Sequence, residues 1–319
     1  MNRLIQLAKK YHLEIIIALF ALLFSAWLYL FTFSYQDGSM IIASKAWSDF
    51  ASHIPLIRSF SFGDNFPPQY PLFSGPFIKY HFLFYAAAGV LEKIGLRIDF
   101  ALNILSIFGF TFLILMIFLF SKEIFKSKIV GAVSILFFIF NGSLSFIEYF
   151  KNNGLSLDSL VLILSNTKFT SFGPYDGGII SAFWNLNIYT NQRHLALSYA
   201  LSLFIIFLLL RFKESQEHKN FEKTLFLGIL LGLSFMLNMA TFLMTVVILF
   251  CLMVFLKNQR TYIFLTLLIA GIISLPQYLF IQKDASDFNI IINTGYLIEN
   301  LSLGNFINYW FRNLGLHLI

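Results

Sequence analysis

The chain has 319 residues, of which 58% are hydrophobic and only 12% charged, and its mean hydropathy is +0.76. Soluble domains carry about 25% charged residues, so this composition excludes an ordinary water-soluble protein and predicts an all-α, polytopic membrane protein. The single cysteine, Cys251, excludes a disulfide framework and a cysteine-based zinc site. Basic cytoplasmic loops explain the net charge of +6, and we expect no nucleic-acid partner.

Uncharged stretches long enough to cross a membrane, about 17 to 25 residues, recur along the chain. They comprise residues 15–33, 100–120, 129–147, 194–210 and 261–282. Residues 224–256 would form a helix of about 50 Å, too long for one crossing, so we expect a hairpin that turns near residues 238–241. The first stretch is too long for a signal peptide and lacks a cleavage site, which predicts an uncleaved span. The total expected is about seven to eight transmembrane helices.

Residues 77–91 are apolar but only 15 in number, and they contain Lys79 and His81. If this segment does not cross the membrane, the inner segments hold 12 Lys and Arg in 37 residues; they are residues 1–12, 121–128, 211–223 and 257–260. The outer segments hold only 8 Lys and Arg in 132 residues; they are residues 34–98, 149–192 and 283–305. That asymmetry satisfies the positive-inside rule. We therefore expect a cytoplasmic N-terminus, with residues 34–98 as an extracytoplasmic platform of interfacial helices on the lipid bilayer. The membrane that we expect is a prokaryotic inner or plasma membrane.

The end of the chain, residues 306–319, resembles either the start of a further span that is cut off after a few apolar residues or a short re-entrant or interfacial end. We therefore expect one domain over residues 1–319, truncated at its C-terminus. No internal repeat and no low-complexity linker divides it.

Asp49 and His53 lie four residues apart in a predicted helix over residues 47–54, which Pro55 is expected to interrupt. This spacing places both side chains on one helical face. A carboxylate at a helix N-terminus can simply stabilise the helix dipole. Beside lipid, however, a carboxylate titrates higher than in water and can act as a general base.

The segment GDNFPPQYPLFSGPFIKYHF (residues 63–82) predicts a turn, an extended stretch and a surface helix that starts at Gly75-Pro76. Lys79 either extends its amine to the membrane surface or, with His81, faces an anionic headgroup. Arg193 and His194 stand where the chain re-enters the membrane. Arg193 is either an interfacial arginine or a bidentate phosphate ligand, and the polar and aromatic residues before it suit sugar hydroxyls and ring faces.

These features together resemble the first hundred and thirty residues of the GT-C membrane glycosyltransferases, namely the lipid A aminoarabinose transferases and the protein mannosyltransferases. The shared pattern is a short N-terminal span, an acidic outer loop, GD, prolines, a lysine, an aromatic segment, GL before a charged turn, and a basic inner loop. The segments YPLFSG (residues 70–75) and YHF (residues 80–82) also resemble uncharacterised bacterial and archaeal relatives. The chain departs from the family where Ser48, rather than a second acid, precedes Asp49, and Asp176 is an alternative second acid or a turn residue.

The resemblance implies a transferase that moves a sugar from a polyprenyl-phosphate donor to a glycan, lipid or protein acceptor on the extracytoplasmic side. Asp49 would be the catalytic base, and Lys79 and Arg193 would offset phosphate charge. His53, His81 and His194 would orient these groups or bind substrate. No cofactor is certain; a divalent cation could assist, although the sequence shows no complete ligand set for it. The alternatives are a transporter, which would place ionisable residues inside its spans, and a noncatalytic assembly partner.

Overall fold

The computed structural model of the chain describes residues 11–43, 47–73, 75–140, 144–165, 185–212, 217–282, 298 and 300–314. It forms two compact units: unit 1 comprises Met1–Ser134 and Tyr189–Ser286, and unit 2 comprises Ile135–Ile188 and Asp287–Ile319. The described elements are almost all helical, which confirms the all-α class. The expectation of a single domain stays a prediction.

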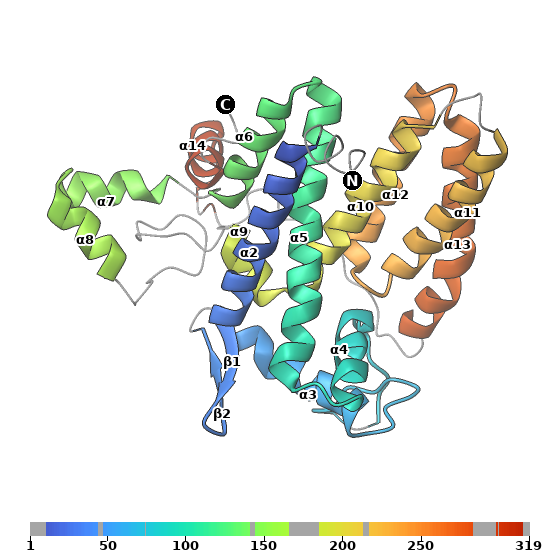
Figure 1. Cartoon of the computed structure of the whole chain (residues 1–319), viewed down its shortest axis with the longest axis horizontal. Helices are drawn as coiled ribbons and strands as arrows, with labels where there is room; N and C mark the ends of the chain where they lie inside the picture. The colour runs from blue at the N-terminus through green and yellow to red at the C-terminus, as the bar shows by residue number, and fades with distance from the viewer. Residues whose placement is uncertain are drawn as a thin grey trace, which may run out of the picture. The chain divides into compact units, whose positions relative to one another are not determined.

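The elements follow one another in this order: α2 (His12–Thr32), β1 (Phe33–Gln36), β2 (Ser39–Ile42), α3 (Trp47–Ser61), α4 (Leu83–Lys93), α5 (Ile98–Phe125), α6 (Lys128–Ile139), α7 (Ser145–Asn153), α8 (Leu157–Ser165), α9 (Asn185–Asn191), α10 (His194–Leu210), α11 (Glu217–Ser234), α12 (Met239–Phe255), α13 (Arg260–Gln282) and α14 (Leu303–Leu314). Figure 1 shows them along the chain.

The long helices of unit 1 carry their apolar side chains outward as well as inward. On α2 the side chains of Leu23, Trp27 and Phe31 are between 58% and 76% exposed, whereas Ala21 and Tyr29 are fully buried. A helix in water would place polar residues on such an outward face, so this surface fits lipid.

Within the described residues three helices, α2, α5 and α13, are long and apolar enough to cross a membrane, and the pair α9 and α10, bent by 110°, adds a fourth if it counts as one span. This finding supports a membrane protein. The larger total of seven to eight spans goes beyond it and stays a prediction.

The predicted span over residues 129–147 is not one helix. Helix α6 ends at Ile139, after 12 residues, and the chain resumes a helix at Ser145. Twelve residues extend only about 18 Å, less than the hydrocarbon core. The sequence Asn-Gly-Ser at 141–143 favours the end of a helix. Hydropathy averaged over a span of about 20 residues does not show such a short signal.

The predicted hairpin over residues 224–256 is confirmed. Helix α11 ends at Ser234, and α12 begins at Met239. The start of α12 is fixed by Asn238, whose side chain caps the helix by accepting a hydrogen bond from the Thr241 amide at 2.8 Å. Gly232 lets α11 approach α13 closely, since a Cβ at this position would lie 2.6 Å from Cβ of Ile273.

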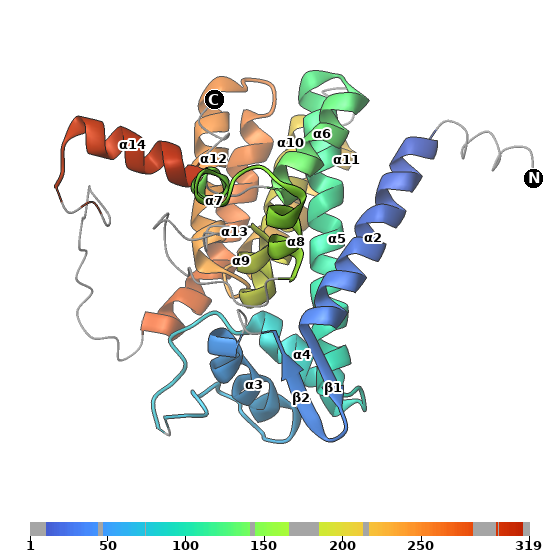
Figure 2. The ribbon, with the colours of Figure 1, turned by 90° about the vertical axis from the view of Figure 1, so that its left-hand side faces the viewer.

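At one end of α2 and α5 lie α3, α4 and a two-stranded antiparallel hairpin (Figures 1 and 2). This hairpin was not predicted, although Asp37-Gly38 is a strong hairpin signal. Both residues adopt the positive φ that such a turn requires. Asp99, at the start of α5, accepts hydrogen bonds from the Tyr35 amide at 3.1 Å and from Arg97. The bond from Tyr35 fastens the hairpin to α5.

Two predicted boundaries in this region are wrong. Helix α3 continues through Pro55 to Ser61, because Ala51, whose carbonyl loses its partner, is exposed and can be solvated. Helix α4 begins at Leu83 rather than near Gly75-Pro76, since the preceding residues are extended: the Ile78 amide donates to the Pro68 carbonyl at 2.9 Å. Helix α4 is also packed more deeply than a surface helix, and its Tyr85 is fully buried.

The basic segments expected on the inner side gather at the opposite end of α2 and α5. Glu14 of α2 pairs with Lys122 at 2.8 Å and with Lys128 at 3.2 Å, and Arg211 lies 4.0 Å from Glu123. The basic segments therefore lie together at one end of the helices, as expected if they all face the same side of the membrane. Which end faces the cytoplasm stays a prediction.

Unit 2 contains α7, α8 and α14. The Leu144 amide, just before α7, donates to the Arg312 carbonyl of α14 at 2.8 Å, and Ser159 of α8 donates to the Asn153 carbonyl at the end of α7 at 3.0 Å. These bonds join the three helices within this unit.

Candidate functional site

A cavity of about 300 Å³ lies in unit 1 beside the first turns of α3. We call it the Asp49 cavity; its lining residues are Asp49, Ser52, His53, Leu56, Tyr70, Tyr80 and Gln192. Asp49 is the single acid among these residues. Segments far apart in the sequence therefore meet at the carboxylate that the sequence had indicated.

Asp49 is half-buried and is held by a carboxamide. Gln192, just before α10, donates from Nε2 to Oδ2 of Asp49 at 2.8 Å, and Tyr80 donates from its hydroxyl to Oε1 of Gln192 at 3.4 Å. Burial, followed by the charge of Asp49, raises the pKa of Tyr80 to about 12. The phenol therefore stays protonated and acts as a donor at neutral pH.

His53 is 4% exposed and forms part of the same wall. Its Nε2 lies 2.8 Å from the hydroxyl of Tyr85, and their rings stack with centroids 4.2 Å apart. Burial, with smaller contributions from His81 and Arg193, lowers the pKa of His53 to about 3. The imidazole is consequently neutral near pH 7.

His53 is one end of a set of linked rings. The hydroxyl of Tyr85 lies 2.9 Å from Nδ1 of His194, and Nε2 of His194 lies 2.7 Å from Nε2 of His81 and 3.1 Å from Nδ2 of Asn238. Burial lowers the pKa of His81 to about 4. We call Asn238, His194, His81, Tyr85 and His53 the histidine chain. It unites the three histidines that the sequence had proposed as binding residues.

Arg193 is next to this chain in sequence but has different surroundings. It is 1% exposed, and its guanidinium donates to Oδ1 of Asn103, to Oγ1 of Thr32 at 3.1 Å and to the Thr190 carbonyl at 3.3 Å. Its carbon Cζ also lies 4.8 Å from the ring centroid of Tyr29. A phosphate could reach this guanidinium only by displacing these partners, so the placement favours a positioning role over direct phosphate contact.

Lys79 is exposed and lies between Ile78, which is buried, and Tyr80, which lines the Asp49 cavity. Its position is compatible with an anionic group at the mouth of the cavity. Asp176, the alternative second acid, and Trp184 lie outside the described residues. In the parts of the chain that the structure describes, no cluster of three His, Cys, Asp or Glu side chains could hold a metal ion, so the divalent cation stays a prediction.

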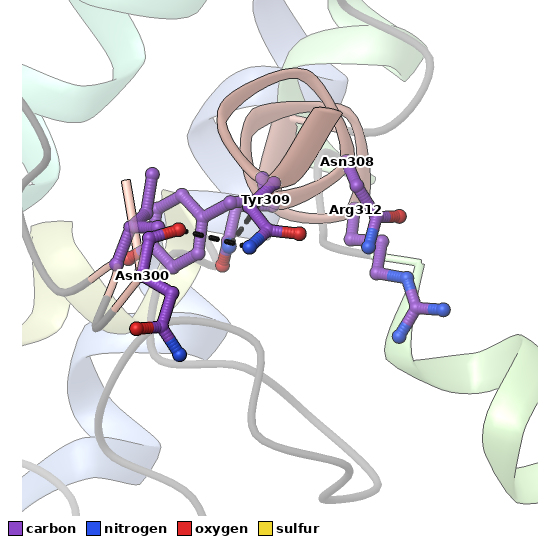
Figure 3. A pocket seen from close by; sticks show the side chains of 7 residues that line it. Asn300, Asn308, Tyr309 and Arg312 are labelled. Carbon is purple, nitrogen blue, oxygen red and sulfur yellow. Dashed lines mark hydrogen bonds between the residues drawn. The ribbon is translucent and has the colours of Figure 1, made fainter. Parts of the chain in front are cut away.

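A second hollow, of about 350 Å³, occurs in unit 2 along α14. Figure 3 shows Asn308 and Arg312 together on one part of it and Asn300 and Tyr309 on another. Nδ2 of Asn305 donates to the Asn300 carbonyl at 2.8 Å. The described residues that line this hollow include amides but no acid. The Asp49 cavity is therefore the better candidate for an active site, because it contains a carboxylate.

Sequence reasoning missed two central members of the site, Tyr85 and Asn238. Tyr85 lies in the segment of residues 77–91 that was expected on the surface, and its position in the first turn of α4 brings it to His53 and His194. Asn238 carried a helix-cap signal at the predicted hairpin turn. That signal could have identified its backbone role but not its contact with His194, because 44 residues separate the two.

No family model, no curated protein and no solved structure matches the chain. The class of protein that the structure itself defines is therefore a helical membrane protein with a cavity built around one carboxylate. Any more specific function depends on the chemistry of that cavity.

Proposed function

We propose that the protein is a membrane glycosyltransferase that moves a sugar from a polyprenyl-phosphate donor to an acceptor on the extracytoplasmic side. One observation carries this proposal: the Asp49 carboxylate lies on the wall of a 300 Å³ cavity, oriented by Gln192. The family resemblance of the first hundred and thirty residues agrees with this assignment.

The proposed reaction is a single displacement at the anomeric carbon. Asp49 accepts the proton of the acceptor hydroxyl while the acceptor oxygen forms a bond to the anomeric carbon. The bond from that carbon to the phosphate oxygen breaks, and the phosphate keeps the electron pair. The configuration at the carbon inverts. General-base catalysis of this kind contributes about 10²- to 10⁴-fold to a rate.

The surroundings of Asp49 suit a sugar. Tyr70 and Tyr80 offer aromatic faces and hydroxyls, while Ser52 and Gln192 offer further hydrogen-bonding groups. The cavity is at the small end of the range for ligand sites, about 300 to 1,000 Å³, so it can take one sugar or acceptor group and not the polyprenyl chain. Lys79, which is exposed, would meet the phosphate outside the cavity.

A proton-coupled transporter is a second candidate, and the histidine chain is the observation that favours it. Linked imidazoles and phenols can relay protons in pumps and transporters. A transporter would move labelled solute into vesicles that contain the purified protein, and this uptake would depend on a proton gradient. A glycosyltransferase would instead transfer label from the lipid donor to an acceptor.

The proposed function can be tested in cells that lack the gene. Mass spectrometry of their surface glycans, lipids and proteins should show the loss of one sugar from one class of molecule, and the wild-type gene should restore it. Glycans that are unchanged across all three classes would contradict the proposal.

A further inference from the structure

The histidine chain has a direction, and Asn238 sets it. Oδ1 of Asn238 accepts the Thr241 amide at 2.8 Å, so the group that faces His194 is the Nδ2 amine, 3.1 Å from Nε2. A carboxamide nitrogen donates and cannot accept. Nε2 of His194 must therefore be an acceptor without a proton.

The remaining protons follow from this constraint. A neutral imidazole has one donor and one acceptor nitrogen, so Nδ1 of His194 carries the proton and donates to the Tyr85 oxygen at 2.9 Å. Tyr85 then donates its single proton to Nε2 of His53 at 2.8 Å. On the other side, Nε2 of His81 lies 2.7 Å from the same acceptor nitrogen of His194, so it carries a proton and shares the single lone pair of that nitrogen with Asn238. In the opposite direction, the Nε2–H of His194 would donate to His81 but would face the Nδ2 amine of Asn238, and this one buried donor would be left unsatisfied.

We propose that Asn238, through this ordered chain, fixes His53 in the tautomer whose Nδ1–H faces a ligand, so that the Asp49 cavity presents an N–H donor beside its carboxylate acceptor. Nε2 of His53 is engaged by Tyr85, which leaves Nδ1 as the ring nitrogen available to a ligand. A donor and an acceptor one helical turn apart suit an uncharged hydroxyl-bearing group. The identification of that group as a sugar or its acceptor rests on the proposed function. Asn238 and His194 are positioning residues in this arrangement.

The first test reads the tautomers directly. In detergent-solubilised protein with ¹⁵N-labelled histidine at pH 7.5, protonated and unprotonated ring nitrogens have well-separated chemical shifts, and single His→Gln variants assign the signals. We expect the proton on Nδ1 of His53 and His194 and on Nε2 of His81. A wild-type His53 with its proton on Nε2 would overturn the proposal.

The second test removes the donor but keeps the helix cap. Asn238→Ser retains a good cap for α12, but its shorter side chain does not reach His194, so His53 should change from one tautomer to a mixture. Asn305→Ser, an exposed asparagine of unit 2, is the matched control and should keep the wild-type signals. A single unchanged His53 tautomer in Asn238→Ser would show that Asn238 does not set the direction.

Transfer assays separate this inference from the proposed function. Asn238→Ser should lower kcat about tenfold, the equivalent of one hydrogen bond, with little change in KM. Wild-type kcat in a variant with mixed tautomers would refute the donor role of His53. If the wild-type protein transfers no sugar, the proposed function fails, while the spectra still decide the direction of the chain.

Discussion

Asp49 and His53 share a face of α3, but their surroundings give them different chemistry. Asp49 is half-buried and receives a hydrogen bond from Gln192, whereas His53 is buried against Tyr85. A neutral imidazole with a pKa of about 3 is a poor base at neutral pH. The imidazole is therefore a hydrogen-bonding group, and the proposed function assigns the role of base to the carboxylate.

Gln192 should matter through the orientation of Asp49. Gln192→Leu keeps a similar volume but removes the donor, so we expect kcat for sugar transfer to fall about tenfold, the value of a hydrogen bond to a charged group at the lower end of its range. Gln36→Leu, a glutamine on the exposed hairpin, is the control. Equal rates in the two variants would exclude an orienting role for Gln192.

At the residue scale, spacing predicted which side chains share a face but not what they contact. The Asp49–His53 pair follows from helical periodicity. Arg193 resembled a phosphate ligand because it precedes a span, yet it is enclosed by Asn103, Thr32 and aromatic rings from distant elements. Such contacts depend on tertiary packing, which a local pattern does not encode.

At the element scale, the close contact of α11 and α13 depends on glycine. A Cβ at Gly232 would lie 2.6 Å from Ile273, whereas a Cβ at Gly271 of α13 meets nothing within 4 Å. Gly232→Ala should therefore destabilise the protein by about 1 to 3 kcal/mol through overpacking. Gly271→Ala should be neutral or stabilising by up to about 1 kcal/mol, because alanine favours the helix.

Thermal unfolding of both variants in the same detergent would measure this difference. A lower midpoint for Gly232→Ala alone is expected. Equal midpoints would mean that the two helices can separate without cost at this position.

The elements were predictable where a long apolar pattern dominated, as in α2, α5, α13 and the hairpin of α11 and α12. They were missed where a short local signal decided the structure. The Asp37-Gly38 turn forms a hairpin in a segment where no strand was expected, and α3 continues through Pro55 where Ala51, one turn earlier, is exposed. Short elements depend on a few turn residues and on neighbours that windowed composition averages away.

At the scale of the whole molecule, acid should destabilise the fold through its buried histidines. Burial holds the pKa of His53 at about 3 and that of His81 at about 4, below the usual 6.5. Between about pH 6.5 and pH 4 the unfolded chain binds more protons than the folded protein. The free energy of unfolding is therefore highest above about pH 6.5 and decreases as the pH falls toward about 4. Each of the two histidines lowers the ratio of folded to unfolded protein by up to about tenfold per pH unit.

Unfolding midpoints measured from pH 7.5 to 4.5 would check this dependence. The double variant His53→Gln/His81→Gln should have a weaker pH dependence than the wild type over that range. An identical slope in both proteins would assign acid sensitivity to other groups.

The topology can be tested at the basic loop between α5 and α6. The pairs of Glu14 with Lys122 and Lys128 gather basic segments at one end, and the positive-inside rule predicts that this end faces the cytoplasm. A reporter fused after Lys128 should therefore read cytoplasmic, and one inserted at the Asp37-Gly38 turn should read external. The reverse pair of signals would place the Asp49 cavity on the inner side.

The most direct measurement of the central claim is sugar transfer by Asp49→Asn in liposomes that contain a radiolabelled polyprenyl-phosphate sugar and an extract of candidate acceptors. The variant keeps the volume of the side chain and its contact with Gln192 but loses the base, so we predict at least a hundredfold loss of transfer, with unchanged membrane insertion. Asp64→Asn, at an exposed turn, should transfer at the wild-type rate. Wild-type transfer by Asp49→Asn would contradict the account.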